Sequence, residues 1–344
     1  MSGPASVYAA ALRHRAELLR MERAAAAEMT RAYGQVWQEL QAELEHLFAR
    51  MAEAREAGEE ITAGWLFERR RLETLQAQAE AEVRRFAAQA EVNIARDQQA
   101  AVRLAQGHAG ELLGQAGVVS SFAQVPDAAL TDLVGTLRNG SPLRTLLDEL
   151  GPAASQAVRE GLIQGVGAGM GSRQIARRIR GALGGDLTRA LTISRTETLR
   201  SYRESTRRNY VANRDVVTGW IWMAAKDMRT CASCWAMDGT VHRLEERMSD
   251  HPNGRCAALP ALRDLDVTAG RAWGADAFAE MSADQQRGVL GIAGYEAFRN
   301  GAVNLSDFVA VKRSRVWGTT RSARTLGAIL GRDEALKWRE TALQ

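Results

Sequence analysis

Three cysteines and His251 lie within 26 consecutive residues and could together hold a metal ion. Cys231 and Cys234 form a C-x-x-C pair, 16 residues separate Cys234 from His251, and four separate His251 from Cys256. Three thiolates and one imidazole are a ligand set that closes a tetrahedral zinc site. We therefore predict one structural zinc ion, or a similar soft metal, bound by Cys231, Cys234, His251 and Cys256.

Two other interpretations of the cysteines stay open at this stage. The thiols could be buried and inert, or Cys231 and Cys234 could form a redox pair. Clustering favours the metal, because all three cysteines of the chain fall in this stretch. The residue usage fits a soluble protein made in a reducing cytoplasm, where clustered cysteines favour metal over a disulfide. His242 is a spare candidate ligand with a less suitable spacing.

The residues around the cysteines resemble the signature of the phage Mu protein F-like family, the minor head or head morphogenesis proteins of tailed phages. The family often reads His-Pro-x-Cys-Arg-Cys, and Gly254 stands where its first cysteine would be, so a metal site must use Cys256. A Gln-Gln-Arg…Trp-Gly order further on extends the resemblance to roughly 120–330. The motif residues expected to have a structural role are Arg195, Thr196, Glu197, Asp227, Arg229, Thr230, Asp238, Gly239, Pro252 and Arg255.

This resemblance implies a non-enzymatic minor head protein, made in the host cytoplasm and located inside the capsid at the portal vertex. Such proteins are carried in the procapsid and can contact packaged double-stranded DNA. The implied partners are therefore the portal protein and other procapsid components, with DNA as a further partner. The longest apolar runs are far short of a membrane span, so no membrane partner is expected.

The strongest strand pattern in the chain, residues 216–225, leads directly into the cysteine stretch. Residues 217, 219, 221 and 223 alternate with Trp220 and Trp222, as in a strand with two different faces. Residues 240–244 are predicted to pair with this strand through a turn at Asp238-Gly239. The cysteine knuckle would then lie at one end of a small antiparallel ribbon. After Cys256 we expect helices, with Ser282 as a helix N-cap.

Two long helices are predicted before these strands, over 5–57 and about 61–106, joined as an antiparallel hairpin. The seam of the first helix follows a coiled-coil spacing through Tyr33, Trp37, Leu40, Leu44, Leu47 and Met51. Two helices alone would leave Val36, Phe48 and Phe67 exposed, and exposed apolar surface marks interaction sites. The hairpin is therefore predicted to be an assembly arm that docks on the portal, and its deletion is expected to leave the knuckle domain folded.

Shorter helices are expected between the arm and the strand. Glycines and prolines interrupt 107–160, with helices predicted at 127–137 and 142–150. Two more helices are predicted at 173–183 and 187–213. The glycine run at 165–171 is interpreted as a helix end and loop, because a helix and not a strand precedes it.

The predicted fold class is mainly α with a small α+β domain. The predicted divisions are an arm over 1–110, a linker with short helices over 111–160, the minor head domain over 161–330, and a helix or tail over 331–344. The Cys/His knuckle occupies 227–256 of the minor head domain.

Charge is near balance overall, at +4, but basic residues gather in parts of the chain. Residues 1–110 carry 14 Lys and Arg against 16 Asp and Glu, so the arm does not look like a DNA-binding tail. Residues 157–230 carry 14 against 6. The candidate contacts with DNA phosphates are Arg200, Arg203, Arg207, Arg208, Lys312, Arg313 and Arg315, with a solvated basic face as the alternative.

No enzyme motif such as a nucleophile elbow, a Walker loop or a zincin helix is present. The main enzymatic rival is a zinc-supported nuclease of the His-Asn-His type, suggested by Asp250-His251 downstream of the C-x-x-C. Such a nuclease keeps its general-base histidine apart from its structural zinc ligands, whereas His251 would have to serve as both. We therefore expect no DNA hydrolysis. A nucleic-acid-binding protein outside virions is the remaining alternative.

Overall fold

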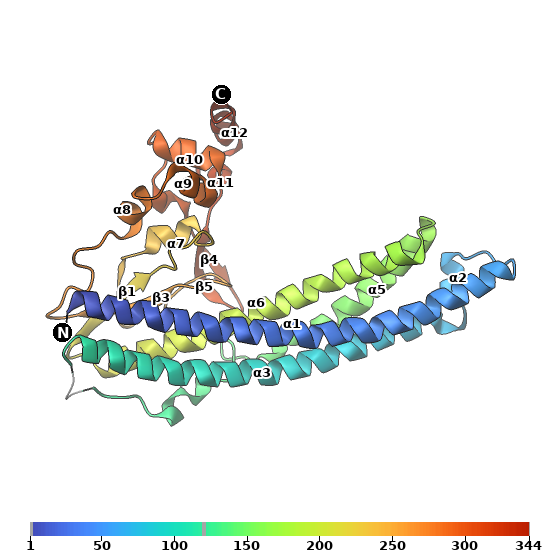
Figure 1. The fold of residues 1–344 in the computed structure, drawn as a ribbon, viewed down its shortest axis with the longest axis horizontal. Helices are drawn as coiled ribbons and strands as arrows, with labels where there is room; N and C mark the ends of the chain where they lie inside the picture. Colours follow the sequence, from blue (N-terminus) through green and yellow to red (C-terminus); the bar gives the residue numbers. More distant parts are fainter. Residues whose placement is uncertain (1–2, 119–121, 344) are drawn as a thin grey trace. The chain divides into compact units, whose positions relative to one another are not determined.

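The computed structural model describes residues 3–118 and 122–343, most of which are helical (Figure 1). Long helices make up most of the first 212 residues, and short strands and helices follow. The predicted fold class, mainly α with a small α+β part, is confirmed. Contacts divide the chain into two compact units. Unit 1 comprises 1–21, 98–140 and 196–344, and unit 2 comprises 22–97 and 141–195.

Helix α1 (Pro4–Glu56) confirms the predicted helix 5–57. Its predicted seam faces inward, because Leu40, Leu44 and Leu47 are all buried. The expectation that Val36 is exposed is wrong, since only 6% of this residue is accessible. The apolar stripe is wider than a two-helix seam because α1 also packs against α6 within unit 2.

The second predicted helix, 61–106, is interrupted near its start. A short helix α2 (Ala63–Phe67) and one turn of 3-10 helix precede the long helix α3 (Arg71–Gln115). At the junction Arg70 has a φ of 57°, which breaks the helical path. Trp65 fixes the turn, since its indole Nε1 donates a hydrogen bond to Glu59 Oε2 at 2.9 Å.

Helix α3 also continues past residue 106, through glycines that were expected to end it. Each glycine costs a helix about 1 kcal/mol relative to alanine. Burial offsets this cost, because Ala109, Leu112 and Leu113 are all in the core of unit 1. Gly110 is useful for its size, as a Cβ there would lie 3.2 Å from the ring of Phe122.

Unit 2 is a helical bundle, in which α5 (Leu150–Gly167) and the first half of α6 (Ser172–Ala212) join the hairpin. Two glycines of α5 allow a close crossing: a Cβ at Gly161 or Gly165 would come within 2.6 Å of Ile179 or Ile175. Helix α6 is continuous, so the two helices predicted over 173–183 and 187–213 are one. Its backbone is held at the expected break, where the Tyr33 hydroxyl donates to the carbonyl of Leu183 at 2.8 Å.

The two helices predicted at 127–137 and 142–150 are shorter than expected. The first is a 3-10 helix over Asp127–Leu133, and the second is α4 (Arg144–Leu147).

Unit 1 contains a three-stranded antiparallel sheet in the order β2-β1-β3. Strands β1 (Val217–Met223) and β2 (Val241–Arg243) confirm the predicted ribbon. Strand β3 (Ala257–Leu262) was not predicted, because helices were expected after Cys256. Proline at position 260 is tolerated because β3 is an edge strand.

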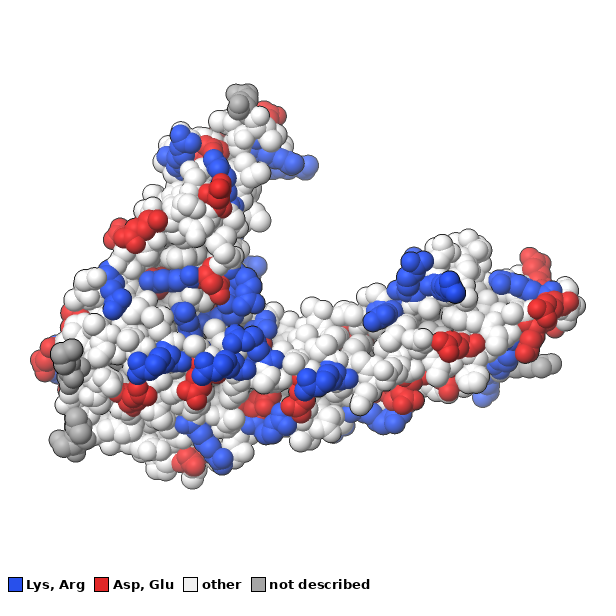
Figure 2. All heavy atoms as spheres, in the orientation of Figure 1, with Lys and Arg blue, Asp and Glu red and all other residues white. Residues whose placement is uncertain are grey.

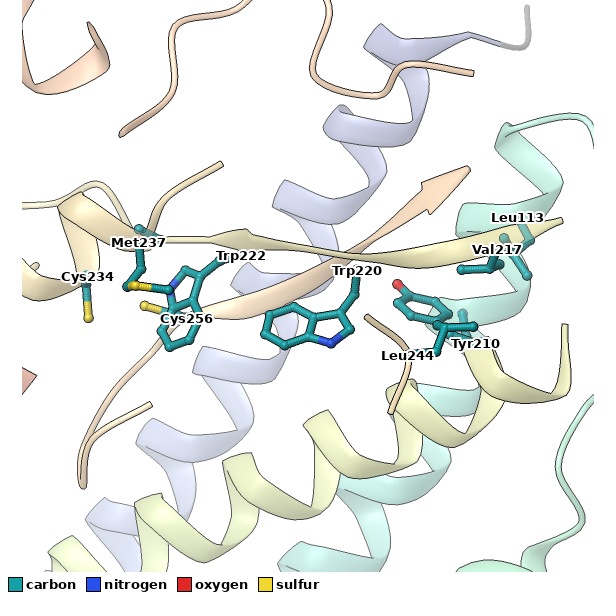
Figure 3. Close-up of a cluster of buried hydrophobic side chains, with 11 residues drawn as sticks. Leu113, Tyr210, Val217, Trp220, Trp222, Cys234, Met237, Leu244 and Cys256 are labelled. Atoms are coloured by element: carbon teal, nitrogen blue, oxygen red, sulfur yellow. The ribbon is translucent and has the colours of Figure 1, made fainter. Parts of the chain in front are cut away.

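Strand β1 is buried on both faces. Ile221 and Met223 face one cluster, with the start of α1 and the end of α3 as its cover. Trp220 and Trp222 face a second cluster that includes Tyr210 of α6 and two cysteines (Figure 3). Residues 4–21 and 98–110, which the sequence assigned to the arm, thus belong to unit 1. A deletion of 1–106 would therefore remove Val7, Ala10 and Ala11 from the cover of the sheet.

The rest of unit 1 packs on the far side of α7 (Ala232–Met237). This part contains α8 (Gly274–Ala279), α9 (Ala283–Leu290), α10 (Ile292–Arg299), α11 (Leu326–Leu330) and α12 (Arg332–Thr341). Ser282 caps α9 as predicted, with a capping box to Gln285. The hairpin of β4 (Val309–Ser314) and β5 (Gly318–Ala323) was not predicted, and it carries the candidate DNA contacts Lys312, Arg313 and Arg315. None of the described helices is both long and apolar enough to cross a membrane.

Candidate metal centre

The register of the sheet explains how the two halves of the cysteine cluster meet. Met223 at the end of β1 pairs with Ala257 at the start of β3, so the chain leaves β1 and enters β3 at the same end of the sheet. Cys231 is the N-cap of α7, which follows β1, and Cys234 lies in its first turn. Cys256 directly precedes β3. Figure 3 shows Cys234 and Cys256 near Trp222 and Met237 at this end of the sheet.

The side chains of Cys231, Cys234 and His251 converge on one point. The Nε2 atom of His251 lies 3.4 Å from the sulfur of Cys231 and 3.4 Å from that of Cys234. Two ligands of a tetrahedral zinc ion, with Zn–S about 2.3 Å and Zn–N about 2.0 Å, are separated by about 3.5 Å. Cys234 also belongs to a second group, with Asp250 and Cys256, whose ligand atoms lie within 4.8 Å of one another. A cavity of about 20 Å³ lies beside these residues.

Protonation within the cluster follows from these contacts. The hydrogen bonds that Cys231 makes with Cys234 and with His251 lower the pKa of its thiol to about 4. Contacts with Cys231 and Cys256 raise the pKa of the Cys234 thiol. Burial alone would lower the pKa of His251, but Cys231 and Asp250 together raise it to about 9. These shifts favour a thiolate at Cys231 beside a protonated His251. Because His251 Nδ1 donates a hydrogen bond to the Pro252 carbonyl at 2.8 Å, Nε2 is the nitrogen that would bind a metal, with loss of its proton.

Asp250 is also a member of the site. From the sequence, it was expected to have a role only if the protein were a nuclease. Its fully buried carboxylate accepts hydrogen bonds from the backbone amides of His251 and Cys256 and from the Arg203 guanidinium, at 2.9, 3.2 and 2.8 Å. A Cβ at Gly254 would lie 2.1 Å from this carboxylate. The carboxylate thus fills the space of a side chain at position 254, where the family often has a cysteine. In the sequence, only the glycine at 254 indicated that another group could occupy this space.

Asp227, Thr230 and Arg255 fix the loop before the first cysteine. Asp227 binds the Arg255 guanidinium through both carboxylate oxygens, and this contact holds the pKa of Asp227 well below its usual range. The same carboxylate accepts hydrogen bonds from the Arg229 amide and the Thr230 hydroxyl, at 3.0 and 3.1 Å. These motif residues position the loop.

Asp238 and Gly239 fix the turn between α7 and β2. The buried Asp238 carboxylate accepts hydrogen bonds from the amides of Ala224 and Gly274, and Lys226 Nζ lies 2.8 Å away. Burial raises the pKa of Asp238, although Lys226 opposes that effect. Gly239 has a φ of 82°, and a Cβ there would meet Trp273 at 2.6 Å, so both conformation and space require glycine.

The Arg-Thr-Glu motif of α6 divides between the two units. Within unit 2, Arg195 pairs with Glu22 of α1. Within unit 1, the Thr196 hydroxyl accepts a hydrogen bond from the Asn253 amide at 3.1 Å and so holds the loop of His251 and Pro252. Glu197, in contrast, pairs on its own helix with Arg200 at 2.6 Å.

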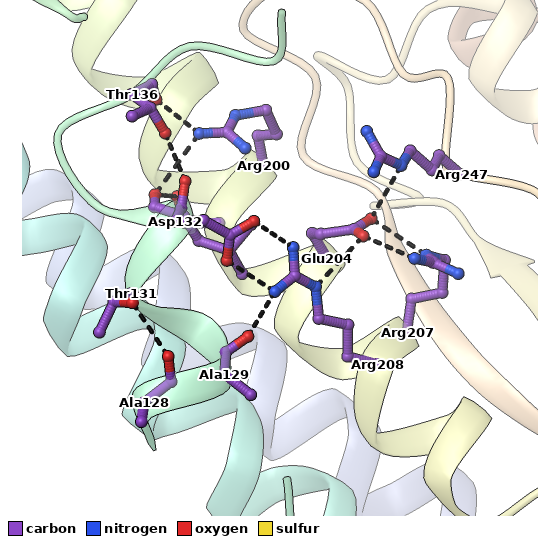
Figure 4. Close-up of polar contacts among 12 residues, drawn as sticks. Ala128, Ala129, Thr131, Asp132, Thr136, Arg200, Glu204, Arg207, Arg208 and Arg247 are labelled. Atoms are coloured by element: carbon purple, nitrogen blue, oxygen red, sulfur yellow. Dashed lines mark hydrogen bonds and ion pairs between the residues drawn. The ribbon is translucent and has the colours of Figure 1, made fainter. Parts of the chain in front are cut away.

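The arginines of α6 that were candidates for DNA contacts are in internal ion pairs. Arg200 pairs with Glu197, Arg203 with Asp250, Arg207 with Glu204 and Arg208 with Asp132, at 2.6 to 2.8 Å. Figure 4 shows Glu204 surrounded by three guanidinium groups, of which that of Arg208 also reaches Asp132. Their side chains are at most 22% exposed. These four positions remain predicted DNA contacts, but their charges are largely neutralised within the protein.

The basic residues of the β4–β5 hairpin have a different environment. Lys312 and Arg313 on β4 and Arg315 in the turn are exposed, and no described carboxylate lies within ion-pair distance of them. Basic side chains gather in the region of this hairpin in Figure 2. Their charge is therefore available to a partner.

His242, the spare candidate ligand, lies away from the cluster. Its ring stacks on Trp220 with a centroid distance of 4.1 Å, and its nitrogens contact Thr240 and Glu246.

Taken together, these features define a helical protein with a small α+β region, in which three thiols, an imidazole and a buried carboxylate meet at one end of a sheet. Residues 156–259 match the family model described as Phage Mu protein F like protein, which confirms the predicted resemblance over this segment. The family indicates a phage head morphogenesis protein, generally structural and located in the virion. The chain has no significant match among curated proteins or solved structures.

Proposed function

We propose that this protein is a non-enzymatic minor head protein that acts at the portal vertex of a tailed phage during head assembly. The family match over 156–259 carries this proposal. The matched segment contains the Arg-Thr-Glu motif, the central strand and every cysteine, and it includes parts of both units.

In this proposal the Cys/His cluster is a structural zinc clip formed by Cys231, Cys234, His251 and Cys256. The 3.4 Å contacts of His251 with two sulfurs support this assignment over inert thiols. Cys256 is a better fourth ligand than Asp250, because both carboxylate oxygens of Asp250 already accept hydrogen bonds. A clip of this kind links α7 to the loop before β3, and its binding free energy becomes folding free energy for the segment.

The proposed docking surface for the portal is a groove of about 630 Å³ in unit 2, between α1 and α6. Trp37, Leu44 and Phe48 form its apolar part, and Arg173 and Arg177 stand exposed at its edge. No described carboxylate pairs with these two arginines. An acidic amphipathic helix of the portal fits this combination of apolar and positive surface, because it can bury apolar residues and meet the arginines at once.

Contact with packaged DNA is proposed for Lys312, Arg313 and Arg315 of the β4–β5 hairpin. These side chains are exposed and unpaired by described carboxylates, which is the condition for binding phosphates with release of counterions. The arginines of α6 are less suitable for this role because they already neutralise internal carboxylates.

The experiment that tests the proposed function is mass spectrometry of virions purified from the source phage. A minor head protein is recovered with the virion at a fixed ratio to the portal. The rival nuclease is tested with supercoiled plasmid plus Mg²⁺, Mn²⁺ or Zn²⁺, for which we expect no nicking. Absence from virions, together with nicking that disappears in His251→Ala, would replace the proposal by the nuclease.

A further inference from the structure

A cavity of about 270 Å³ in unit 1 adjoins the metal centre at Asp250 and is unusually rich in arginine. Five arginines and four carboxylates line it, contributed by α6, by the segment 132–140, by the loop 247–252 and by the β4–β5 hairpin. The four carboxylates belong to the ion pairs with Arg200, Arg203, Arg207 and Arg208 described above. Since Arg207 pairs with Glu204 from outside the cavity lining, the charges of the other two lining arginines, Arg138 and Arg247, are in excess.

Arg138 is a half-buried guanidinium without a carboxylate partner among the described residues. Its Nη1 donates to the carbonyl of Thr319 at 3.2 Å, an uncharged acceptor. Burial lowers the pKa of Arg138, and the neighbouring charge of Arg247 adds to this effect. A guanidinium in such a place is stabilised by any anion that enters, because burial of an unpaired charge is costly.

Arg247 is only weakly paired. Its Nε lies 3.6 Å from Glu204, a carboxylate that Arg207 and Arg208 already contact. Half of its side chain is exposed, so it can turn toward a ligand without loss of a strong contact. In Figure 4 its guanidinium points toward Arg200, which lines the same cavity.

Two buried polar atoms of the cavity wall, Oε1 of Glu197 and the indole Nε1 of Trp317, make no hydrogen bond of good geometry. The two side chains are neighbours, since the Trp317 indole opposes the rise that burial causes in the pKa of Glu197. The indole N–H can only donate, so an anion satisfies it. Burial raises the pKa of Glu197 despite its contact with Arg200, and the protonated form of this carboxyl can donate to an anion as well. Unsatisfied buried groups of this kind mark a place where a ligand gains hydrogen bonds that the protein alone does not make.

We propose that this cavity binds a phosphate group between Arg138 and Arg247. Two guanidinium groups offer forked donors that match a tetrahedral oxyanion, and their excess of two positive charges matches a phosphate dianion. The volume holds one phosphate with several waters, since a water occupies about 30 Å³ of liquid. The phosphate comes either from a free anion or from a nucleic-acid backbone, and the site itself does not depend on the proposed role in head assembly.

The test uses isothermal titration of the full chain with sodium phosphate, with sodium chloride at the same ionic strength as the reference. We expect saturable binding of one phosphate, at least tenfold weaker in Arg247→Gln and lost in the double variant Arg138→Gln/Arg247→Gln. Arg299→Gln, at an exposed position outside the cavity, should bind as the wild type does. Because Arg247 is half exposed, Arg247→Gln is expected to fold, which its melting curve checks.

A short DNA duplex added to the phosphate-loaded protein distinguishes the two sources. Displacement of phosphate by the duplex assigns the site to a backbone phosphate, and duplex binding without displacement assigns it to a free anion. Binding no stronger than that of chloride, or unchanged affinity in a folded Arg247→Gln variant, overturns the proposal.

Discussion

At the scale of single residues, Asp250 links the two halves of the cysteine cluster. Its carboxylate orients the backbone of His251 and Cys256 and neutralises Arg203, whose side chain is only 10% exposed. Loss of one partner from a buried ion pair leaves an uncompensated charge, which typically costs about 3–5 kcal/mol. The exchange of a cysteine for Gly254 is thus accompanied by a carboxylate that supports the remaining ligands.

The proposed zinc clip gives a prediction at this scale. Protein purified without a tag should contain about one zinc per chain, and removal of the metal by a chelator should lower its melting temperature. Cys256→Ser should lose most of the metal, because the serine hydroxyl is a poor replacement for a thiolate. Elemental analysis by mass spectrometry measures the content, and a melting curve measures the stability.

The control for this experiment is Thr240→Ser, a small change outside the ligand set, which should keep its zinc. Zinc below a tenth of one equivalent, with melting unchanged by chelation, would assign the three thiols to the core instead. Full zinc in Cys256→Ser, lost in Asp250→Asn, would make Asp250 the fourth ligand.

At the scale of elements, three helices of unit 1 meet at a pair of buried histidines. The rings of His14 on α1 and His108 on α3 are stacked with centroids 3.8 Å apart. His108 contacts the hydroxyl of Tyr202 on α6 at 2.8 Å and Glu17 at 3.3 Å, and His14 contacts Glu111 at 2.7 Å. Burial, followed by the nearby charge of His14, lowers the pKa of His108 to about 4.

This pair predicts acid destabilisation of the helix junction. Because the folded pKa of His108 lies below its unfolded value of about 6.5, its neutral form stabilises the fold above pH 6.5. That stability is lost as the pH falls toward 4, by about 2 kcal/mol between pH 7 and pH 5. His108→Gln, which can still bond to Tyr202, should show a flatter dependence when urea unfolding is measured across this range.

His46→Gln, an exposed position on α1, serves as the matched control and should follow the wild-type curve. Metal loss in acid affects all three proteins alike, so the comparison is between slopes. Equal slopes for wild type and His108→Gln would show that other groups cause the acid sensitivity.

Elements with a strong local pattern were predictable from the sequence, and those set by tertiary contacts were not. The coiled-coil spacing of α1 and the alternating pattern of β1 predicted both elements and most of the residues on their buried faces. Strand β3 was missed because its six residues, Ala-Ala-Leu-Pro-Ala-Leu, have no alternation and contain a proline. The continuity of α6 was missed because contacts such as that of Tyr33 with Leu183 outweigh local glycine propensity.

The candidate site shows the same division. Ligand spacing sufficed to group Cys231, Cys234 and His251. It could not identify Asp250, whose role depends on space left by Gly254, nor the ion pairs that neutralise the arginines of α6. Partners three or four residues apart on a helix are visible in a sequence, whereas a pair such as Arg203 with Asp250 requires the fold.

At the scale of the whole molecule, docking on the portal is predicted to depend on the groove of unit 2. The double variant Arg173→Glu/Arg177→Glu should reduce co-purification with the portal at least tenfold, because it reverses the charge that faces an acidic helix. Both side chains are exposed, so the melting temperature should stay within about 2 °C of the wild type. Affinity capture of the portal from procapsids measures the effect.

Arg31→Glu/Arg159→Glu is the matched control, since it makes the same charge change at exposed positions of unit 2 outside the groove. Incorporation of the Arg173/Arg177 variant at the wild-type level would move docking to another surface of the chain. A point variant is preferable to deletion of 1–106, which also removes residues that cover the sheet.

The cover of β1 also imposes an order on biosynthesis. Val7 and Ala10, from the beginning of α1, share a cluster with Leu259 of β3. At about 5–20 residues per second, roughly 250 residues of further translation separate them, or on the order of 10–50 s. Throughout that interval the apolar side chains at the start of α1 have been synthesised, but β3, on which they pack, has not. We therefore expect chaperones to bind the nascent chain until late in its synthesis. Slower translation should increase the aggregation of this protein more than the aggregation of a protein whose sheet is covered by segments that are adjacent in sequence.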